Sequence, residues 1–159
     1  MRQQSHLLAR LVLSLPLVAA VGGCAAPPEA QADVRILRLQ RGQWQVVRID
    51  GQAPALSSEQ TLRLGGDGYL RGYAGCNDFV GAYSVDADRL SPGRLETHAP
   101  IERAAAAASP GLKPCTAAQQ ADERRFLGVL ERVNAFALRD DGTLLLQAPG
   151  DHVIEARQR

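Results

Sequence analysis

The twelve residues from Gly72 to Tyr83 constrain the fold of this chain more than any other stretch. They contain three glycines, a cysteine, an asparagine and three aromatic residues. Glycine adopts backbone angles that a Cβ atom forbids, and asparagine tolerates the left-handed region better than most residues. Gly75-Cys76-Asn77 is therefore predicted to form a sharp turn or bulge between two strands. Because strand side chains alternate, Phe79 and Tyr83 are predicted to share one face. By physics alone this is a tight corner of a β-protein.

The same stretch resembles the G-C-N-x-F/Y-x-G-x-Y signature of META domains, the family of HslJ-like heat-shock lipoproteins. The resemblance extends over residues 42–156. Its specific matches are Trp44, Gly75, Cys76, Asn77, Phe79, Gly81, Tyr83, Cys115 and the segment 123–130. It implies a fold and an envelope compartment, because members are linked to envelope stress and to tolerance of noxious compounds, but it implies no reaction.

One segment departs from the META pattern. Members usually carry a compact T-R-M-x-C element, whereas here Thr97 comes early and Cys115 late. An Ala-rich insertion at about residues 98–114 separates them, with a short helix predicted at Ile101–Ala108. This insertion puts in doubt whatever function that element serves elsewhere.

The amino terminus has the pattern of a lipoprotein signal. Residues 1–23 begin with basic residues, continue with an apolar run over 11–21 and end in small residues. The run is too short to span a bilayer, which needs about 20 apolar residues. Val21-Gly22-Gly23-Cys24 resembles a lipobox, which predicts cleavage before Cys24 and acylation of its sulfur. The alternative is a plain secretory signal with a chance cysteine.

The residues after Cys24 predict where the protein resides. In Gram-negative envelopes an Asp directly after the lipidated cysteine usually retains a lipoprotein in the inner membrane. Ala25 therefore resembles the address of an outer-membrane lipoprotein facing the periplasm. Residues 24–33 are Ala, Pro and polar residues, so they are predicted to be a flexible tether that holds the domain off the membrane. Residues 34–159 are predicted to form one META-like domain.

The charge of the mature chain excludes two classes of partner. Removing residues 1–23, which hold Arg2 and Arg10 and no acidic residue, leaves 16 Lys and Arg against 17 Asp and Glu. Nucleic acids and acidic lipids call for a basic surface. The near-neutral balance therefore argues against both as partners of the domain as a whole.

The rest of the mature chain is mostly β, with one confident helix. Thr116 and Gln119 form a capping box that opens an amphipathic helix running to about Val133. Val34–Leu39 fits either a short strand or a helical turn. Strands are predicted at Trp44–Ile49, Thr61–Leu64, Tyr69–Tyr73, Val80–Val85, Leu90–Thr97 (interrupted by Pro92-Gly93), Ala135–Leu138, Thr143–Gln147 and His152–Ala156. We expect an α+β fold: an antiparallel, partly open β-barrel or twisted sheet packed on one helix.

The chemistry-bearing residues suggest structure more than catalysis. His98 and His152 have no metal-ligand neighbours at suitable spacing, so no metal or cofactor is expected. Cys76 and Cys115 are an even pair in an oxidising compartment, which favours a disulfide between them. A catalytic pairing of either cysteine with His98 is the alternative. Four aromatics are interpreted either as the wall of a ligand groove or as core: Tyr69, Tyr73, Phe79 and Tyr83.

Three functional hypotheses follow from these residues and from the resemblance. The leading hypothesis is a non-enzymatic envelope lipoprotein that supports outer-membrane integrity or stress tolerance through contacts with another envelope protein. The second is a carrier or sensor of a small apolar ligand held between helix and sheet. The third is a thiol-dependent enzyme. The partner, the ligand and the oligomeric state are not specified by the sequence.

Overall fold

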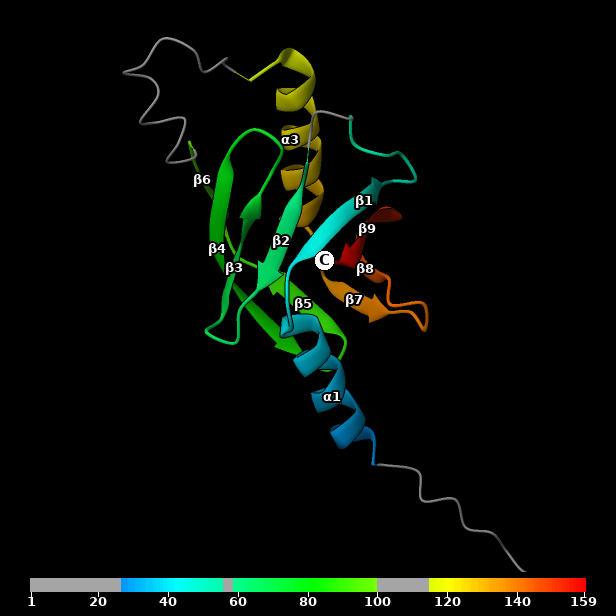
Figure 1. Cartoon of the computed structure of the whole chain (residues 1–159). Coiled ribbons are helices and arrows are strands. Elements are labelled where there is room, and N and C mark those ends of the chain that lie inside the picture. Colours follow the sequence, from blue (N-terminus) through cyan, green and yellow to red (C-terminus); the bar gives the residue numbers. More distant parts are fainter. Residues whose placement is uncertain (1–26, 56–58, 100–114) are drawn as a thin grey trace, which may run out of the picture.

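The computed structural model describes residues 27–55, 59–99 and 115–159. The predicted signal 1–23, Cys24 and most of the Ala-rich insertion, including Ile101–Ala108, lie outside them. Within the described residues, two helices and nine strands form an α+β fold, as predicted (Figure 1). In chain order they are α1 (Pro28–Gln40), β1 (Trp44–Ile49), β2 (Thr61–Leu64), β3 (Tyr69–Tyr73), β4 (Asp78–Asp86), β5 (Arg89–Pro92), β6 (Glu96–His98), α3 (Ala117–Leu130), β7 (Ala135–Leu138), β8 (Leu144–Ala148) and β9 (His152–Gln158).

The strands form one antiparallel sheet that curls into a nearly closed barrel. Their order is β5-β4-β3-β2-β1-β9-β8-β7, and β6 pairs with β4. Between the two ends of this order, the Phe136 N–H donates to the Asp88 carbonyl at 2.9 Å and the Leu90 N–H donates to the Asn134 carbonyl at 3.3 Å. These bonds bring β5 beside β7. Closing a sheet in this way protects backbone groups that an open edge would expose.

The strand predicted at Leu90–Thr97, with an interruption at Pro92-Gly93, is two separate strands. Strand β5 ends at Pro92, which lies opposite Tyr83 of β4, and β6 then pairs with the earlier part of β4, with Glu96 opposite Val80. Pro92 is tolerated here because its ring nitrogen needs no partner at this edge position. The Gly93 N–H still donates to the Ala82 carbonyl at 2.8 Å, and the chain leaves this ladder after Gly93. The predicted meander of the last three strands is confirmed as β7-β8-β9.

Helix α3 packs its apolar face on the barrel. Phe126 and Leu130 are fully buried, and the Phe126 ring meets the Phe79 ring edge-on with centroids 5.7 Å apart. The predicted capping box is present, with Thr116 accepting from the Gln119 N–H. The helix ends at Leu130, before the predicted Val133, because the backbone tightens into turns there, but the Val133 side chain is buried as expected.

Helix α1 corrects the expectation at the amino-terminal side. Residues 28–33, predicted as part of a flexible tether, begin this 13-residue helix, and Val34–Leu39 is helical. Proline fits the first helical turn, where its missing N–H has no partner to lose, and Ala, Glu and Gln are good helix formers. Leu39 is fully buried, and its carbonyl accepts from the Trp44 indole N–H at 2.9 Å. This tertiary contact selects the helix where the local pattern was ambiguous.

Candidate functional site

The signature turn has the shape that its residues predict. Gly75 lies at φ +101°, in a region that favours glycine, and the Ala74 N–H donates to the Asn77 carbonyl at 2.8 Å to close the turn between β3 and β4. Gly81 is required for a different reason. A Cβ atom there would lie 2.7 Å from the Arg94 carbonyl oxygen. Phe79 and Tyr83 share the barrel interior, as predicted.

A carboxylate and a disulfide tie this turn to α3 and to the residue that precedes its cap. Glu123 accepts from the Asn77 backbone N–H at 2.7 Å and from the Asn77 side-chain amide at 3.0 Å. Cys76 is bonded to Cys115, one residue before the Thr116 cap, with a Cα–Cα distance of 5.8 Å. The disulfide favoured by the cysteine count is therefore present, and both sulfurs are occupied. Sequence reasoning missed the role of Glu123, because its partner lies 46 residues away.

A buried amide adds a third link at the same end of the barrel. Gln60, 1% exposed, donates to the Ala74 carbonyl at 3.2 Å and to the Asp122 carbonyl at 3.1 Å. The Asp122 carboxylate accepts from the Ala55 N–H at 2.8 Å. These contacts lock the loop before β2 between the signature turn and α3. No local pattern indicated them, because each joins residues distant in sequence.

The opposite end of the barrel is organised by Tyr83. Its hydroxyl donates to the Gly65 carbonyl at 2.8 Å and accepts from the Gln40 amide at 2.9 Å, so one side chain connects the β2-β3 hairpin with the end of α1. Burial raises the pKa of Tyr83 above its ordinary value, although the Gln40 hydrogen bond acts in the other direction. The hydroxyl is therefore a neutral structural donor at physiological pH.

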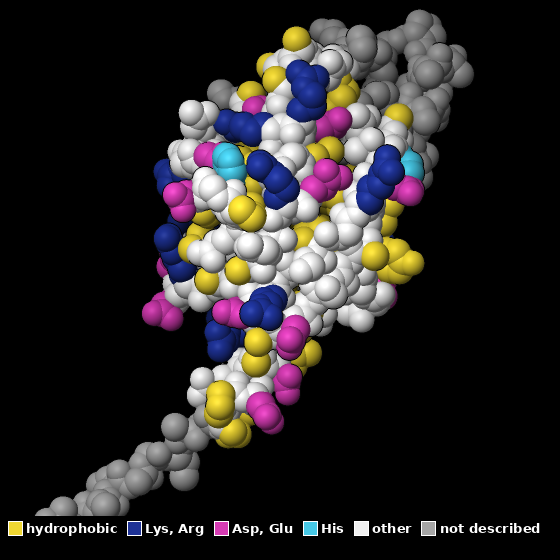
Figure 2. Space-filling model, turned by 180° about the vertical axis from the view of Figure 1, so that it is seen from behind, with side chains coloured by type: hydrophobic (Ala, Val, Ile, Leu, Met, Phe, Trp, Pro, Cys, Tyr) yellow, Lys and Arg dark blue, Asp and Glu magenta, His cyan; other side chains and the backbone are white. Residues whose placement is uncertain are grey.

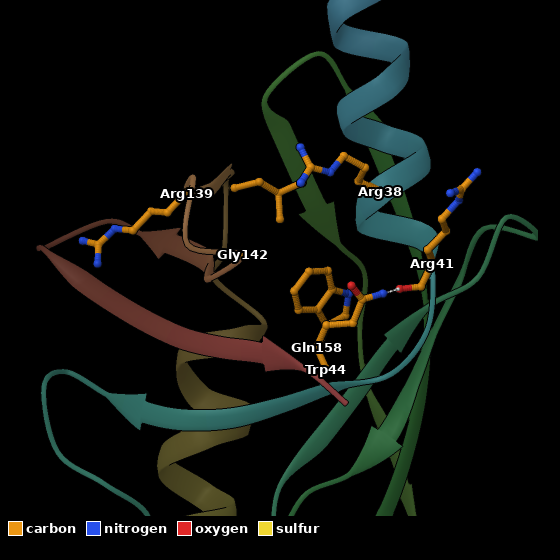
Figure 3. A pocket seen from close by; sticks show the side chains of 7 residues that line it. Arg38, Arg41, Trp44, Arg139, Gly142 and Gln158 are labelled. Carbon is orange, nitrogen blue, oxygen red and sulfur yellow. Dashed lines mark hydrogen bonds between the residues drawn. The ribbon is translucent and has the colours of Figure 1, made fainter.

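A pocket of about 250 Å³ lies beside this end of α1 (Figure 3). It is lined by Arg38, Arg41, Trp44, Leu138, Arg139, Gly142 and Gln158. The Gln158 side chain donates to the Arg41 carbonyl at 2.8 Å, which fixes one wall. In Figure 3, Arg38 extends over the pocket, whereas the Arg139 side chain points away from it. Within the described parts of the chain, no carboxylate forms an ion pair with any of these three arginines.

Of the other residues singled out in the sequence, Tyr73, Phe79 and His98 line one open depression of about 560 Å³. Tyr69, Tyr83 and His152 lie outside it. Tyr69 is 47% exposed, whereas Phe79 and Tyr83 are buried, so the four aromatics do not line a common groove. Instead, Tyr69 lies under the Arg71 guanidinium, 5.0 Å from its centre. His98 is exposed at the end of β6. His152 lies at the surface, 2.9 Å from the Asp50 carboxylate.

The described residues contain neither a cluster of metal-ligating side chains nor a membrane-spanning helix. Among residues 27–55, 59–99 and 115–159, no three His, Cys, Asp or Glu side chains are grouped as a metal site would require. Neither α1 nor α3, the helices in this part of the chain, is long and apolar enough to cross a membrane.

The fold and the signature turn define a class: a small antiparallel barrel whose Gly-Cys-Asn turn is fastened to a capped helix. The chain belongs to the META domain family, because the model of that family matches residues 37–159. Helix α1 precedes the matched region for most of its length. The fold is similar to that in an NMR structure of a protein from Burkholderia xenovorans, with 20% identity, a TM-score of 0.57, and coverage of 93% of this chain and 99% of that chain. No curated protein matches the sequence.

Proposed function

We propose that this META-domain protein is a non-enzymatic lipoprotein, anchored through Cys24 in the outer membrane and facing the periplasm, where it supports envelope integrity through contacts with another protein. The proposal that the protein is not an enzyme is supported by the contacts that the signature side chains make within the fold. Cys76 is bonded to Cys115, Asn77 is held by Glu123, and Tyr83 bonds Gly65 and Gln40. Each of these groups is engaged in holding the fold, which supports a structural role for the signature.

The anchoring part rests on the amino-terminal pattern. A basic start, a short apolar run and Val21-Gly22-Gly23-Cys24 support acylation. Acyl chains contribute about 0.8 kcal/mol per buried methylene, so two or more chains hold a protein at the membrane. Ala25, in place of Asp, supports the outer membrane as the destination.

Fractionation of cell envelopes tests the anchor. The wild-type protein is expected in the outer-membrane fraction, and Cys24→Ser is expected either uncleaved or in the soluble periplasmic pool. Ala25→Asp is the matched control, since it keeps the acylation site and should move the protein to the inner membrane. A wild-type protein found in the soluble pool together with Cys24→Ser would refute the anchor.

A second candidate function, a carrier of a small ligand, is favoured by the pocket at Trp44. The space between α3 and the sheet, where the ligand was expected to bind, is filled by the buried side chains of Phe126, Val129 and Leu130. The pocket of about 250 Å³ lies instead at the opposite end, beside α1. Its arginines favour an amphipathic anion over a wholly apolar ligand. Native mass spectrometry of protein purified from membranes tests this function, and an unliganded mass in every preparation would argue against it.

A further inference from the structure

The walls of the pocket at Trp44 come from separate parts of the fold. The end of α1 and the residue after it supply Arg38 and Arg41, the β7-β8 hairpin supplies Leu138, Arg139 and Gly142, and the end of β9 supplies Gln158. Trp44 is 2% exposed, and its indole N–H is fixed by the Leu39 carbonyl at 2.9 Å. A molecule in this pocket therefore contacts both the helix and the barrel.

The lining of this pocket carries positive charge without a compensating carboxylate. It includes three arginines and no acidic residue. Within the described chain, none of the three forms an ion pair. Figure 2, by contrast, shows a face of the molecule on which basic side chains are interspersed with acidic ones. The pocket is thus a local excess of positive charge in a chain that is near neutral overall.

The acidic residues nearest to this lining in sequence belong to the turn between β7 and β8. Asp141 is engaged within that turn, where its carboxylate accepts from the Thr143 N–H at 2.9 Å. Hydrogen bonds from Thr143 are the main cause that holds the pKa of Asp141 below its ordinary value, and the charge of Arg139 contributes least. Neither Asp140 nor Asp141 forms an ion pair among the described residues. The turn therefore does not occupy the guanidinium of Arg139.

Two of the arginines start from opposite walls of the pocket. In Figure 3, Arg38 extends from α1 over the pocket, whereas Arg139 of the β7-β8 hairpin points away from it. Both side chains are exposed, so Arg139 is free to change rotamer and turn towards a ligand. A guanidinium binds a phosphate or a carboxylate through two parallel N–H···O bonds. Two guanidinium groups suit a dianion, and a phosphate monoester is close to a dianion at neutral pH.

The volume of the pocket limits its ligand to a small molecule. About 250 Å³ is available, which lies below the roughly 300–1,000 Å³ typical of pockets for drug-sized ligands. Leu138 and the edge of the Trp44 ring provide a small apolar surface beside the arginines. The lining therefore fits one anionic group that carries a short apolar group.

We propose that the pocket at Trp44 binds a small phosphate monoester, and that the bound phosphate fastens α1 to the β7-β8 hairpin through Arg38 and Arg139. This inference rests on the ligand-carrier function proposed above and names its ligand class. The end of α1 is held by the Trp44 bond to the Leu39 carbonyl and by the bond between Gln40 and Tyr83. A phosphate bonded to Arg38 adds a further link, so binding should make local opening of this end of the helix rarer.

Titration of the full-length, processed protein with phenyl phosphate tests the site. Trp44 is the single tryptophan of the chain and lines the pocket, so its emission reports occupancy. A saturable change in emission is expected, and Arg38→Gln should raise the half-saturating concentration by about tenfold or more. Arg124→Gln, an exposed arginine of α3 outside the pocket, is the matched control and should leave that concentration unchanged. Equal effects of the two substitutions would overturn the site.

Three further probes test the ligand class. Benzoate carries the same ring with a single negative charge, and benzyl alcohol carries the ring without charge, so both should bind more weakly than phenyl phosphate. Tighter binding of benzoate or benzyl alcohol would overturn the assignment to phosphate. Vesicles of phosphatidic acid present a phosphate monoester on a lipid. A response to these vesicles and none to phenyl phosphate would place the phosphate on a lipid head group and overturn the small ligand.

Hydrogen exchange tests the fastening of α1. At saturating phenyl phosphate, amides in the last turn of α1 should exchange about threefold more slowly or less, while those of α3 should be unchanged. Arg139→Gln should remove most of this protection, because it cuts the link to the hairpin. A saturable Trp44 response without slower exchange in α1 would overturn the fastening.

Native mass spectrometry of protein purified from membranes separates this inference from the carrier function. A bound mass in protein whose Trp44 emission does not respond to phenyl phosphate would overturn the phosphate assignment and leave the carrier function intact. Absence of both a bound mass and a response would refute the two together.

Discussion

The two ends of the barrel hold their helices in different ways. At the signature end, a disulfide, a carboxylate and a buried amide connect the turn at Cys76 and Asn77 with α3. At the other end, among the described residues, two side-chain hydrogen bonds and one face of its last turns hold α1. The arginines that line the pocket beside it form no ion pair with a described carboxylate. The side chains that fasten the first end are engaged with one another, and an open depression lined by Tyr73, Asp78, Phe79 and His98 lies next to them. The second end carries a pocket lined by Trp44 and three arginines.

Removing the disulfide at the signature end should have the largest effect on stability. Cys76→Ala with Cys115→Ala should lower the free energy of unfolding by about 4 kcal/mol, because the bond closes a long loop in the unfolded chain. Chemical denaturation of both proteins, with and without reductant, measures the loss. The wild-type protein should lose a similar amount in reductant, whereas the double variant should not respond. An unchanged wild-type midpoint in reductant would contradict the prediction.

The carboxylate at the same end should have the next largest effect. Glu123→Ala leaves the Asn77 backbone and side-chain N–H groups without their acceptor, which should cost about 1–3 kcal/mol. Glu123→Gln is the matched control, because it keeps one acceptor oxygen and the side-chain volume, and should cost less. Urea denaturation of the wild type and the two variants measures these losses in the free energy of unfolding. Equal losses in the two variants would mean that the charge, and not the hydrogen bonds, holds the turn.

A smaller effect is expected at the α1 end. Tyr83→Phe removes the bonds to the Gly65 carbonyl and the Gln40 amide while keeping the ring in the core, so we expect a loss of about 0.5–1.5 kcal/mol. Hydrogen exchange sharpens the comparison, since amides in the last turn of α1 should exchange faster while those of α3 stay protected. Equal acceleration in both helices would show that the two ends are not independent.

The smallest effect is expected at the surface pair formed by Asp50, which follows β1, and His152, which begins β9. Burial is the largest single influence and raises the pKa of Asp50, but the hydrogen bonds with Val153 and His152 and the nearby positive charges together outweigh it and keep this pKa below its ordinary value of 3.8. The stabilisation of the fold by the ionised Asp50 carboxylate is therefore present above pH 3.8, and it is lost as the pH falls through the folded-state pKa. Because the Asp50 side chain is 36% exposed, screening limits it to about 1 kcal/mol or less.

Asp50→Asn isolates this charge, because asparagine tolerates the observed φ of +52° at this position. Melting temperatures of wild type and variant should differ slightly at pH 7 and converge at pH 3. A difference that grows in acid would show that the sign of the assigned pKa shift is wrong.

Local patterns were sufficient for most of the elements. Alternation at Trp44–Ile49, the glycines of the β2-β3 hairpin and the capping box at Thr116 each act over a few residues, so the sequence alone predicts them. The same holds for the shared face of Phe79 and Tyr83 and for the turn at Gly75. Cysteine pairing was also predictable, since only two cysteines follow Cys24.

Features that depend on contacts between distant segments were visible only in the tertiary structure. Residues 28–40 include good helix formers, but an isolated helix of this length is marginal in water, and the contacts of α1 with the barrel are the burial of Leu39 and the bond from Trp44 to its carbonyl. The closure of the barrel between β5 and β7, the Glu123 acceptor for Asn77 and the pocket at Trp44 each join segments far apart in the chain. Periodicity reports which face of a segment is buried, but it does not report which other segment covers it, and that pairing determined both ends of this molecule.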